Sequence, residues 1–203
     1  MCEYKAPNIR NCNFIRFPSA FKDAVKAGAD VIEFDVWLSQ DGKVVVHHDQ
    51  NFCRMCGDNF KQNIFETNYA DFPPIIPPEG QSARCHLFPS EECHTIPSLE
   101  TVLQSIPANV AINIEFKQDS EKLTRDVREL IYKYNRNENT FWFSLDEKIN
   151  KKLRKEDPSL PTITSIPTVL KVLALYYVGV LPFVDMDDAV YGTTLEEASI
   201  LCH

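Results

Sequence analysis

A pair of carboxylates lies inside an apolar segment of this 203-residue chain, at residues 31–36, VIEFDV. Side chains alternate between the two faces of a strand, so Glu33 and Asp35 would share one face while the other face is apolar throughout. Two neighbouring carboxylates repel each other and cost several kcal/mol to bury unless a cation lies between them. The pair therefore indicates either a cation site or an exposed strand end whose acids face water or pair with lysines.

Two further strand-like segments carry ionisable side chains in a similar way. Residues 44–46 are followed by His48, and the segment 109–117 ends with Glu115 and Lys117. Charged residues gathered at the C-terminal ends of successive parallel strands form the active sites of (β/α) barrels. We therefore expect the carboxylates to converge on one divalent cation, and their hard oxygens suit Mg²⁺ or Ca²⁺ better than Zn²⁺. The expected metal ligands are Glu33, Asp35 and Glu115.

A framework of alternating strands and helices is needed to position these residues. The turn at Asp41-Gly42 joins the first two strand-like segments, and the apolar residues of 119–135 recur at a helical spacing that predicts packing against a core. Strands that alternate with helices predict an α/β fold with a parallel sheet. We expect helices at 18–26, 98–106, 119–135 and 147–155, and further strands at 140–144 and 161–165.

A series of short motifs follows in order along the chain, at 27–36, 41–42, 45–49, Arg54 with Gly57, 96–103 and 113–117. Taken together, these motifs resemble those of the glycerophosphodiester phosphodiesterase family. Segments 131–136 and 179–184 look most similar to the membrane-associated branch of the family that has lysophospholipase D activity. The resemblance implies part of a TIM (β/α)8 barrel of the PLC-like phosphodiesterase type, in which we expect strands two to six to be present and strands one, seven and eight to be missing.

The same resemblance implies a chemistry and roles for the residues. The family hydrolyses glycerophosphodiesters or lysophospholipids with the help of a divalent cation, Mg²⁺ or Ca²⁺, which Glu33, Asp35 and Glu115 would hold. Lys117 would contact the phosphate of the substrate. His48 would be the catalytic general acid for the leaving alkoxide, and we interpret the neighbouring His47 as structural.

The two ends of the chain depart from the family. The resemblance covers 19–184, including an insertion loop region at 50–95, whereas the segments 1–18 and 185–203 do not fit. A His-Arg-Gly motif, which would supply the second acid/base histidine, does not occur upstream of residue 19. We therefore expect impaired activity, or alternatively a catalytically silent truncated isoform that binds metal, lipid or a full-length relative.

The overall composition limits the partners and the compartment. A net charge of −8 argues against nucleic-acid binding, which needs a basic face. The seven cysteines are too sparse for a secreted disulfide scaffold, and the chain shows no signal peptide and no Asn-x-Ser/Thr sequon. We expect an intracellular protein at the cytoplasmic face of, or associated with, internal membranes. Cys53 and Cys56 could form a zinc site with 85–86 and 93–94, but the wide, irregular spacing argues against it.

The most apolar stretch of the chain is 169–184, which contains a single lysine. About 20 apolar residues are needed to span a bilayer, and this segment is shorter. Two interpretations remain: a buried helix of the barrel that leads into a loop, or a segment that lies against a membrane and admits acyl chains.

Overall fold

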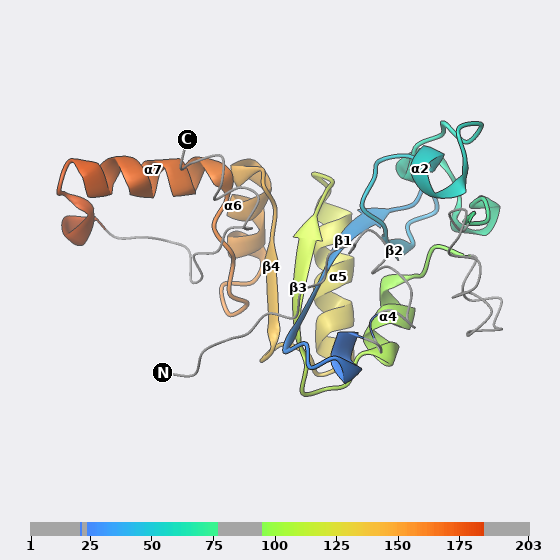
Figure 1. Cartoon of the computed structure of the whole chain (residues 1–203), viewed down its shortest axis with the longest axis horizontal. Coiled ribbons are helices and arrows are strands. Elements are labelled where there is room, and N and C mark those ends of the chain that lie inside the picture. The colour runs from blue at the N-terminus through green and yellow to red at the C-terminus, as the bar shows by residue number, and fades with distance from the viewer. Residues whose placement is uncertain (1–20, 22–23, 77–94, 185–203) are drawn as a thin grey trace.

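The computed structural model describes residues 21, 24–76 and 95–184 (Figure 1). The strands are β1 (Val31–Leu38), β2 (Val44–Val46), β3 (Ala111–Phe116) and β4 (Thr140–Phe143). The α-helices are α2 (Cys53–Cys56), α4 (Leu99–Ser105), α5 (Glu121–Lys133), α6 (Glu147–Glu156) and α7 (Ile166–Tyr177). Short 3-10 turns follow at η1 (Ile64–Glu66), η2 (Tyr69–Asp71) and η4 (Leu181–Phe183). The expected off-family segments 1–18 and 185–203, and residues 77–94 of the expected insertion, lie outside the described residues.

The four strands form one sheet in the order β2-β1-β3-β4. β1, β3 and β4 are parallel neighbours, and helices α4 and α5 lie in the connections between them. The register places Asp35 beside Glu115 and Glu33 beside Asn113 across β1 and β3. This alternation of parallel strands and helices confirms the α/β fold class.

Two details of the expected strand count are wrong. β2 is antiparallel to β1, so 44–46 is not a parallel barrel strand in its own right. Only five residues separate the two strands, whereas a parallel crossover needs about a dozen or more, and Gly42 adopts a positive φ of 82° in the turn. The expected strand at 161–165 is reduced to an isolated parallel bridge between Trp142 and Thr162.

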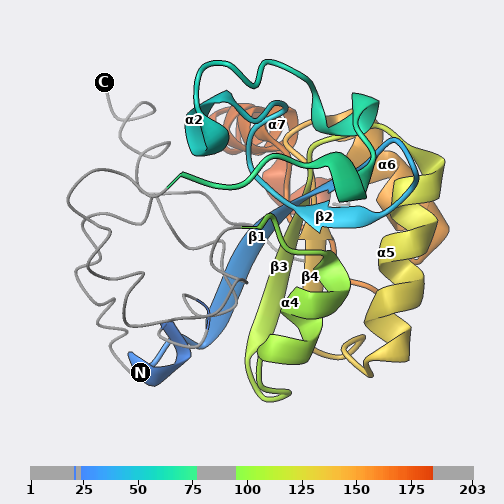
Figure 2. The same ribbon diagram turned by 90° about the vertical axis from the view of Figure 1, so that its right-hand side faces the viewer.

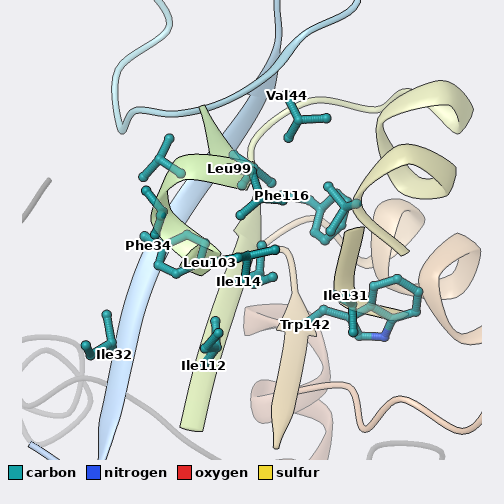
Figure 3. Packing of buried hydrophobic residues seen from close by; sticks show 14 of the residues in the cluster. Ile32, Phe34, Val44, Leu99, Leu103, Ile112, Ile114, Phe116, Ile131 and Trp142 are labelled. Carbon is teal, nitrogen blue, oxygen red and sulfur yellow. The ribbon is translucent and has the colours of Figure 1, made fainter. Parts of the chain in front are cut away.

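One face of the sheet carries the main hydrophobic core. Helices α4, α5 and α6 cover this face (Figure 2), and the strands contribute the side chains that alternate toward it. Figure 3 shows Leu103 of α4 close to Phe34 and Ile114, with Ile131 of α5 near Trp142. Because each of these side chains is almost fully buried, this layer supplies most of the apolar burial that holds the strands in place.

Two of the helices begin close to where the sequence predicts. The Ser98 hydroxyl accepts a hydrogen bond from the backbone N–H of Thr101, and the Ser120 hydroxyl accepts one from Leu123, so each serine caps a helix N-terminus. These caps confirm the predicted starts of α4 and α5, the two helices that link β2 to β3 and β3 to β4.

Of the two interpretations of the apolar segment 169–184, the buried barrel helix is wrong. None of the residues of α7 is buried, and Figure 1 shows α7 extending away from the sheet beyond α6. Tyr177 is 81% exposed, and Phe183 in the following turn is 87% exposed. Among the described residues, no helix has both the length and the apolar character that a bilayer crossing requires.

Candidate metal centre

Three carboxylates meet on the face of the sheet opposite the helical layer. Glu33 and Asp35 are two residues apart in β1 and so share a face, and Glu115 is the register partner of Asp35 in β3. Each of the three offers a ligand oxygen within 4.8 Å of the others. The structure therefore brings together the three acids that the sequence singled out, and their role as metal ligands stays a prediction.

Lys117 lies against the two buried members of this group. Its Nζ atom is 2.5 Å from Oε1 of Glu115 and 3.1 Å from Oδ1 of Asp35. Burial raises the pKa of Glu115, and Asp35 adds to this effect while Lys117 opposes it. Burial would lower the pKa of Lys117, but the charges of Asp35 and Glu115 outweigh it, so the pKa of the ammonium is raised. The lysine is thus a charged, largely desolvated partner of the acids.

The residues of this cluster fit a hard divalent cation. Three carboxylates and one ammonium leave a formal charge of −2, which a divalent ion would neutralise. Asn113, the register partner of Glu33, adds a buried side-chain oxygen that has no hydrogen-bond partner in the described part of the chain. Carboxylate and amide oxygens are the ligands that Mg²⁺ and Ca²⁺ prefer.

The loop after β2 places His48 near this end of β1 but outside the carboxylate group. The backbone N–H of His47 donates to the carbonyl of Asp35 over 3.0 Å, and this hydrogen bond holds the loop beside the part of β1 that carries the acids. The His48 side chain is 51% exposed, and its Nδ1 lies 2.7 Å from Oδ1 of Asp49. His47 is buried, with its Nε2 atom 3.2 Å from the carbonyl of Asn51, which agrees with a structural role.

Asp49 and Arg54 form a chain of contacts with His48, and neither of them is assigned a role from the sequence alone. Asp49 contacts Nδ1 of His48 through one carboxylate oxygen and accepts a hydrogen bond from Nε of Arg54, over 2.6 Å, through the other. A carboxylate bound to one ring nitrogen fixes the orientation of an imidazole and leaves the other nitrogen to exchange protons. The signal for this arrangement is the His-Asp dipeptide with an arginine five residues later.

The alternative zinc site is tested only in part by the structure. Cys56 is buried, and its thiol donates to the carbonyl of Pro73 over 3.5 Å. Burial raises the pKa of this thiol to about 11, which disfavours the thiolate that zinc requires. The other expected zinc ligands, at 85–86 and 93–94, lie outside the described residues.

Sequence comparisons relate the chain to phosphodiesterases. The model of the glycerophosphoryl diester phosphodiesterase family matches residues 18–172. Human lysophospholipase D GDPD1 is 36% identical over 166 residues, which cover 82% of this chain and 52% of the relative. Human lysophospholipase D GDPD3 is 29% identical over 173 residues, covering 83% of this chain and 52% of that protein. The chain thus spans about half the length of these curated relatives.

Solved structures with similar folds are also phosphodiesterases. A phosphodiesterase from Oleispira antarctica, solved with the product sn-glycerol-3-phosphate, superposes with a TM-score of 0.65 at 18% sequence identity. The match covers 92% of this chain and 74% of the chain of that protein. The glycerophosphodiester phosphodiesterase of Thermotoga maritima gives a TM-score of 0.54 at 24% identity, covering 79% of this chain and 62% of its own. These similarities show that the described fold is part of a TIM barrel, as expected from the sequence.

Proposed function

This chain belongs to the glycerophosphoryl diester phosphodiesterase family, and from that premise we propose that it serves metal-dependent hydrolysis of a phosphodiester bond. The proposed substrates are glycerophosphodiesters or lysophospholipids. In the reaction, water adds to phosphorus and the bond to one ester oxygen breaks. Hydrolysis of a glycerophosphodiester would give glycerol 3-phosphate and a free alcohol. Hydrolysis of a lysophospholipid, which carries an acyl chain, would give lysophosphatidic acid and a free alcohol.

The observation that carries this proposal is the convergence of Glu33, Asp35 and Glu115 from two neighbouring parallel strands. These three residues would hold the Mg²⁺ or Ca²⁺ ion. A bound divalent cation would supply positive charge that stabilises the charge growing on the phosphoryl oxygens. Lys117, on the same face of the sheet, would add a second positive contact to the phosphate.

His48 would act as the general acid. Its ring is exposed enough to meet a substrate, and Asp49 holds it through Nδ1. The proton would pass from Nε2 to the leaving alkoxide, a contribution typically worth about 10²–10⁴ in rate. Asp49 is itself fixed by Arg54, so the chain Arg54–Asp49–His48 would present the imidazole in one orientation.

A second candidate function is binding without turnover. The resemblance implies a second histidine in a His-Arg-Gly motif, and that tripeptide does not occur in these 203 residues. A phosphodiesterase with one of two acid/base groups would be impaired but still active. In this second candidate the chain is silent: it would hold the cation and a phosphate ester without hydrolysing the ester.

One assay separates the two candidates. The 203-residue chain is incubated with lysophosphatidylcholine or glycerophosphocholine and either Mg²⁺ or Ca²⁺, and choline release is followed. Hydrolysis that Glu33→Ala abolishes supports the phosphodiesterase. Metal binding without choline release supports the silent binder, and a chain that neither binds metal nor releases choline contradicts both.

We also propose a peripheral membrane contact through the exposed apolar surface of α7 and η4, which bears Leu170, Tyr176, Tyr177 and Phe183. Aromatic side chains favour the interface between lipid and water, and a lysolipid substrate would reside there. The acidic chain gives no general attraction to anionic lipid, so apolar contact must supply the binding. The cytoplasmic face of internal membranes remains the predicted location.

A further inference from the structure

Lys117 and a bound metal would need the same oxygens. The Nζ atom contacts Oε1 of Glu115 at 2.5 Å and Oδ1 of Asp35 at 3.1 Å, and both carboxylates belong to the candidate ligand set. The Asp35 and Glu115 side chains are only 7% and 10% exposed, so water offers them little alternative solvation. A cation that binds both carboxylates must therefore compete with the ammonium.

The backbone explains why Lys117 reaches these two acids. Lys117 follows Glu115 by two residues, so both side chains point to the same face. Its backbone N–H still donates to the carbonyl of Val36 over 3.4 Å, which keeps this position tied to β1. From there the side chain reaches back to Glu115 and across to Asp35.

We propose that Lys117 is an exchangeable counter-ion of the carboxylate cluster: it neutralises Asp35 and Glu115 until a divalent cation displaces it, and the displaced ammonium then becomes available for an anion. The inference rests on the proposed metal site and adds an order of events to it. Because the lysine stabilises the state without metal, it lowers the affinity for metal. Metal binding, in turn, frees the lysine to meet a phosphate.

The first test measures affinity for Mg²⁺ and Ca²⁺ alone by calorimetry on the chelator-treated 203-residue chain. Lys117→Met removes the competing charge and keeps much of the side-chain volume, and we expect it to bind metal about 5- to 150-fold more tightly, the usual range for coupled sites. Lys117→Arg keeps the charge and should bind like the parent. Lys133→Met is the matched control, since it removes a lysine that pairs with Glu100 at 2.6 Å among the helices.

The second test uses the unchanged chain and does not depend on whether a variant folds. A short pulse of acetic anhydride, followed by peptide mass spectrometry, reports how accessible each lysine amine is. We expect acetylation of Lys117 to rise when saturating Mg²⁺ or Ca²⁺ is present, because the ion pairs that cover Nζ are broken. Acetylation of Lys133 should not change.

The outcomes separate this inference from the proposed function. If Lys117→Met binds metal no more tightly than the parent, or if metal leaves the acetylation of Lys117 unchanged, the exchange is wrong. The metal site still stands in that case, provided that Glu33→Gln loses binding. If the parent binds neither Mg²⁺ nor Ca²⁺ at millimolar concentration, both the exchange and the proposed metal site are wrong.

Discussion

Asp35 and Glu115 are register partners in the parallel strands β1 and β3, and the ammonium of Lys117 lies between them. Neighbouring strands are about 4.8 Å apart, so two acids in this relationship repel each other strongly once water is excluded. The strand pairing itself thus creates the need for a positive charge at this position.

Replacing Glu115 by glutamine should weaken metal binding. The substitution keeps the shape of the side chain but removes one of three negative charges, so we expect the Kd for Mg²⁺ and Ca²⁺ to rise at least about tenfold, or about 1.4 kcal/mol. Calorimetry measures the change. Glu100→Gln, which alters an acid paired with Lys133 and Lys43 among the helices, serves as the control and should leave the Kd unchanged. An unaltered Kd in Glu115→Gln would exclude this residue as a ligand.

Replacing Asp49 by asparagine should impair turnover more than substrate binding. The variant loses the charge that links Arg54 to His48, so the imidazole is held less firmly while the carboxylate cluster is untouched. We expect kcat to fall about 10- to 100-fold, as for other residues that orient a functional imidazole, with little change in KM. Choline release measures both constants. Asp58→Asn, on the exposed loop after α2, should behave like the parent, and an equal fall in both variants would contradict the positioning role.

Asp157 should make folding stability depend on acid pH. Burial favours the protonated form, but hydrogen bonds from Ser159, Tyr132 and Arg128 outweigh it, so the pKa of Asp157 is lowered from its ordinary value of 3.8. When the pKa of a carboxylate is lower in the folded state than in the unfolded state, its stabilisation is fully present at a pH above the unfolded-state pKa. This stabilisation is lost as the pH falls through the folded-state pKa.

Asp157→Asn tests this dependence. We expect the free energy of unfolding at pH 7 to drop by about 1.5–3 kcal/mol, the value of hydrogen bonds to a charged group, and the loss of stability below pH 4 to become shallower. Urea unfolding at several pH values measures both effects. Asp119→Asn removes a surface carboxylate paired with Lys152 and should change the free energy by less than about 1 kcal/mol. Parallel pH profiles for the parent and Asp157→Asn would show that the prediction is wrong.

Cys56 should react slowly with alkylating agents. Its thiol is buried and its pKa is raised to about 11, so little thiolate is present near pH 8, and only the thiolate attacks. Cys53 in the same short helix is partly exposed and provides an internal comparison. A time course with iodoacetamide at pH 8, read by peptide mass spectrometry, should show Cys53 modified first. Equal rates would mean that the helix opens far more often than its packing indicates.

Charges placed on α7 and η4 should weaken binding to zwitterionic vesicles. Leu170 is 51% exposed and Phe183 is 87% exposed, so glutamate at either position should not disturb the core. We expect co-sedimentation of the chain with phosphatidylcholine vesicles to fall in Leu170→Glu and Phe183→Glu. Ile76→Glu, which alters an apolar residue that is 58% exposed elsewhere, should sediment like the parent. Unchanged sedimentation of the folded α7 and η4 variants would end the membrane proposal.

Local sequence patterns are sufficient to predict the strand that carries Glu33 and Asp35 and the helices that begin close to Ser98 and Ser120. The alternation of apolar and polar residues and the position of a hydroxyl before a helix depend on neighbours in the chain. The direction of β2 was also predictable in principle, because the connection from β1 is too short for a parallel crossover. A parallel strand at 44–46 is incompatible with that limit.

Other features depend on contacts between distant segments. The pairing of Asp35 with Glu115 and Lys117 joins strands that are far apart in sequence. The polar positions of each strand suggest that the acids converge, but they do not show which oxygens the lysine contacts. The exposure of α7 could not be predicted from its apolar composition, since composition does not reveal whether another surface covers a helix. The link from Arg54 to Asp49 depends on a loop geometry that has no periodic signal.

The separation of the two faces of the sheet affects which amino-acid substitutions this chain can accept. The helices cover one face of the sheet, which carries Trp142, Phe34 and Ile114, and the opposite face carries Glu33, Asp35 and Glu115. Adjacent residues of one strand therefore contribute alternately to the hydrophobic core and to the carboxylate cluster. Substitutions on the face that carries the acids would change its charge without repacking the interior. New specificities can therefore accumulate on this scaffold by exchanging every second residue of a strand, while the intervening residues preserve its architecture.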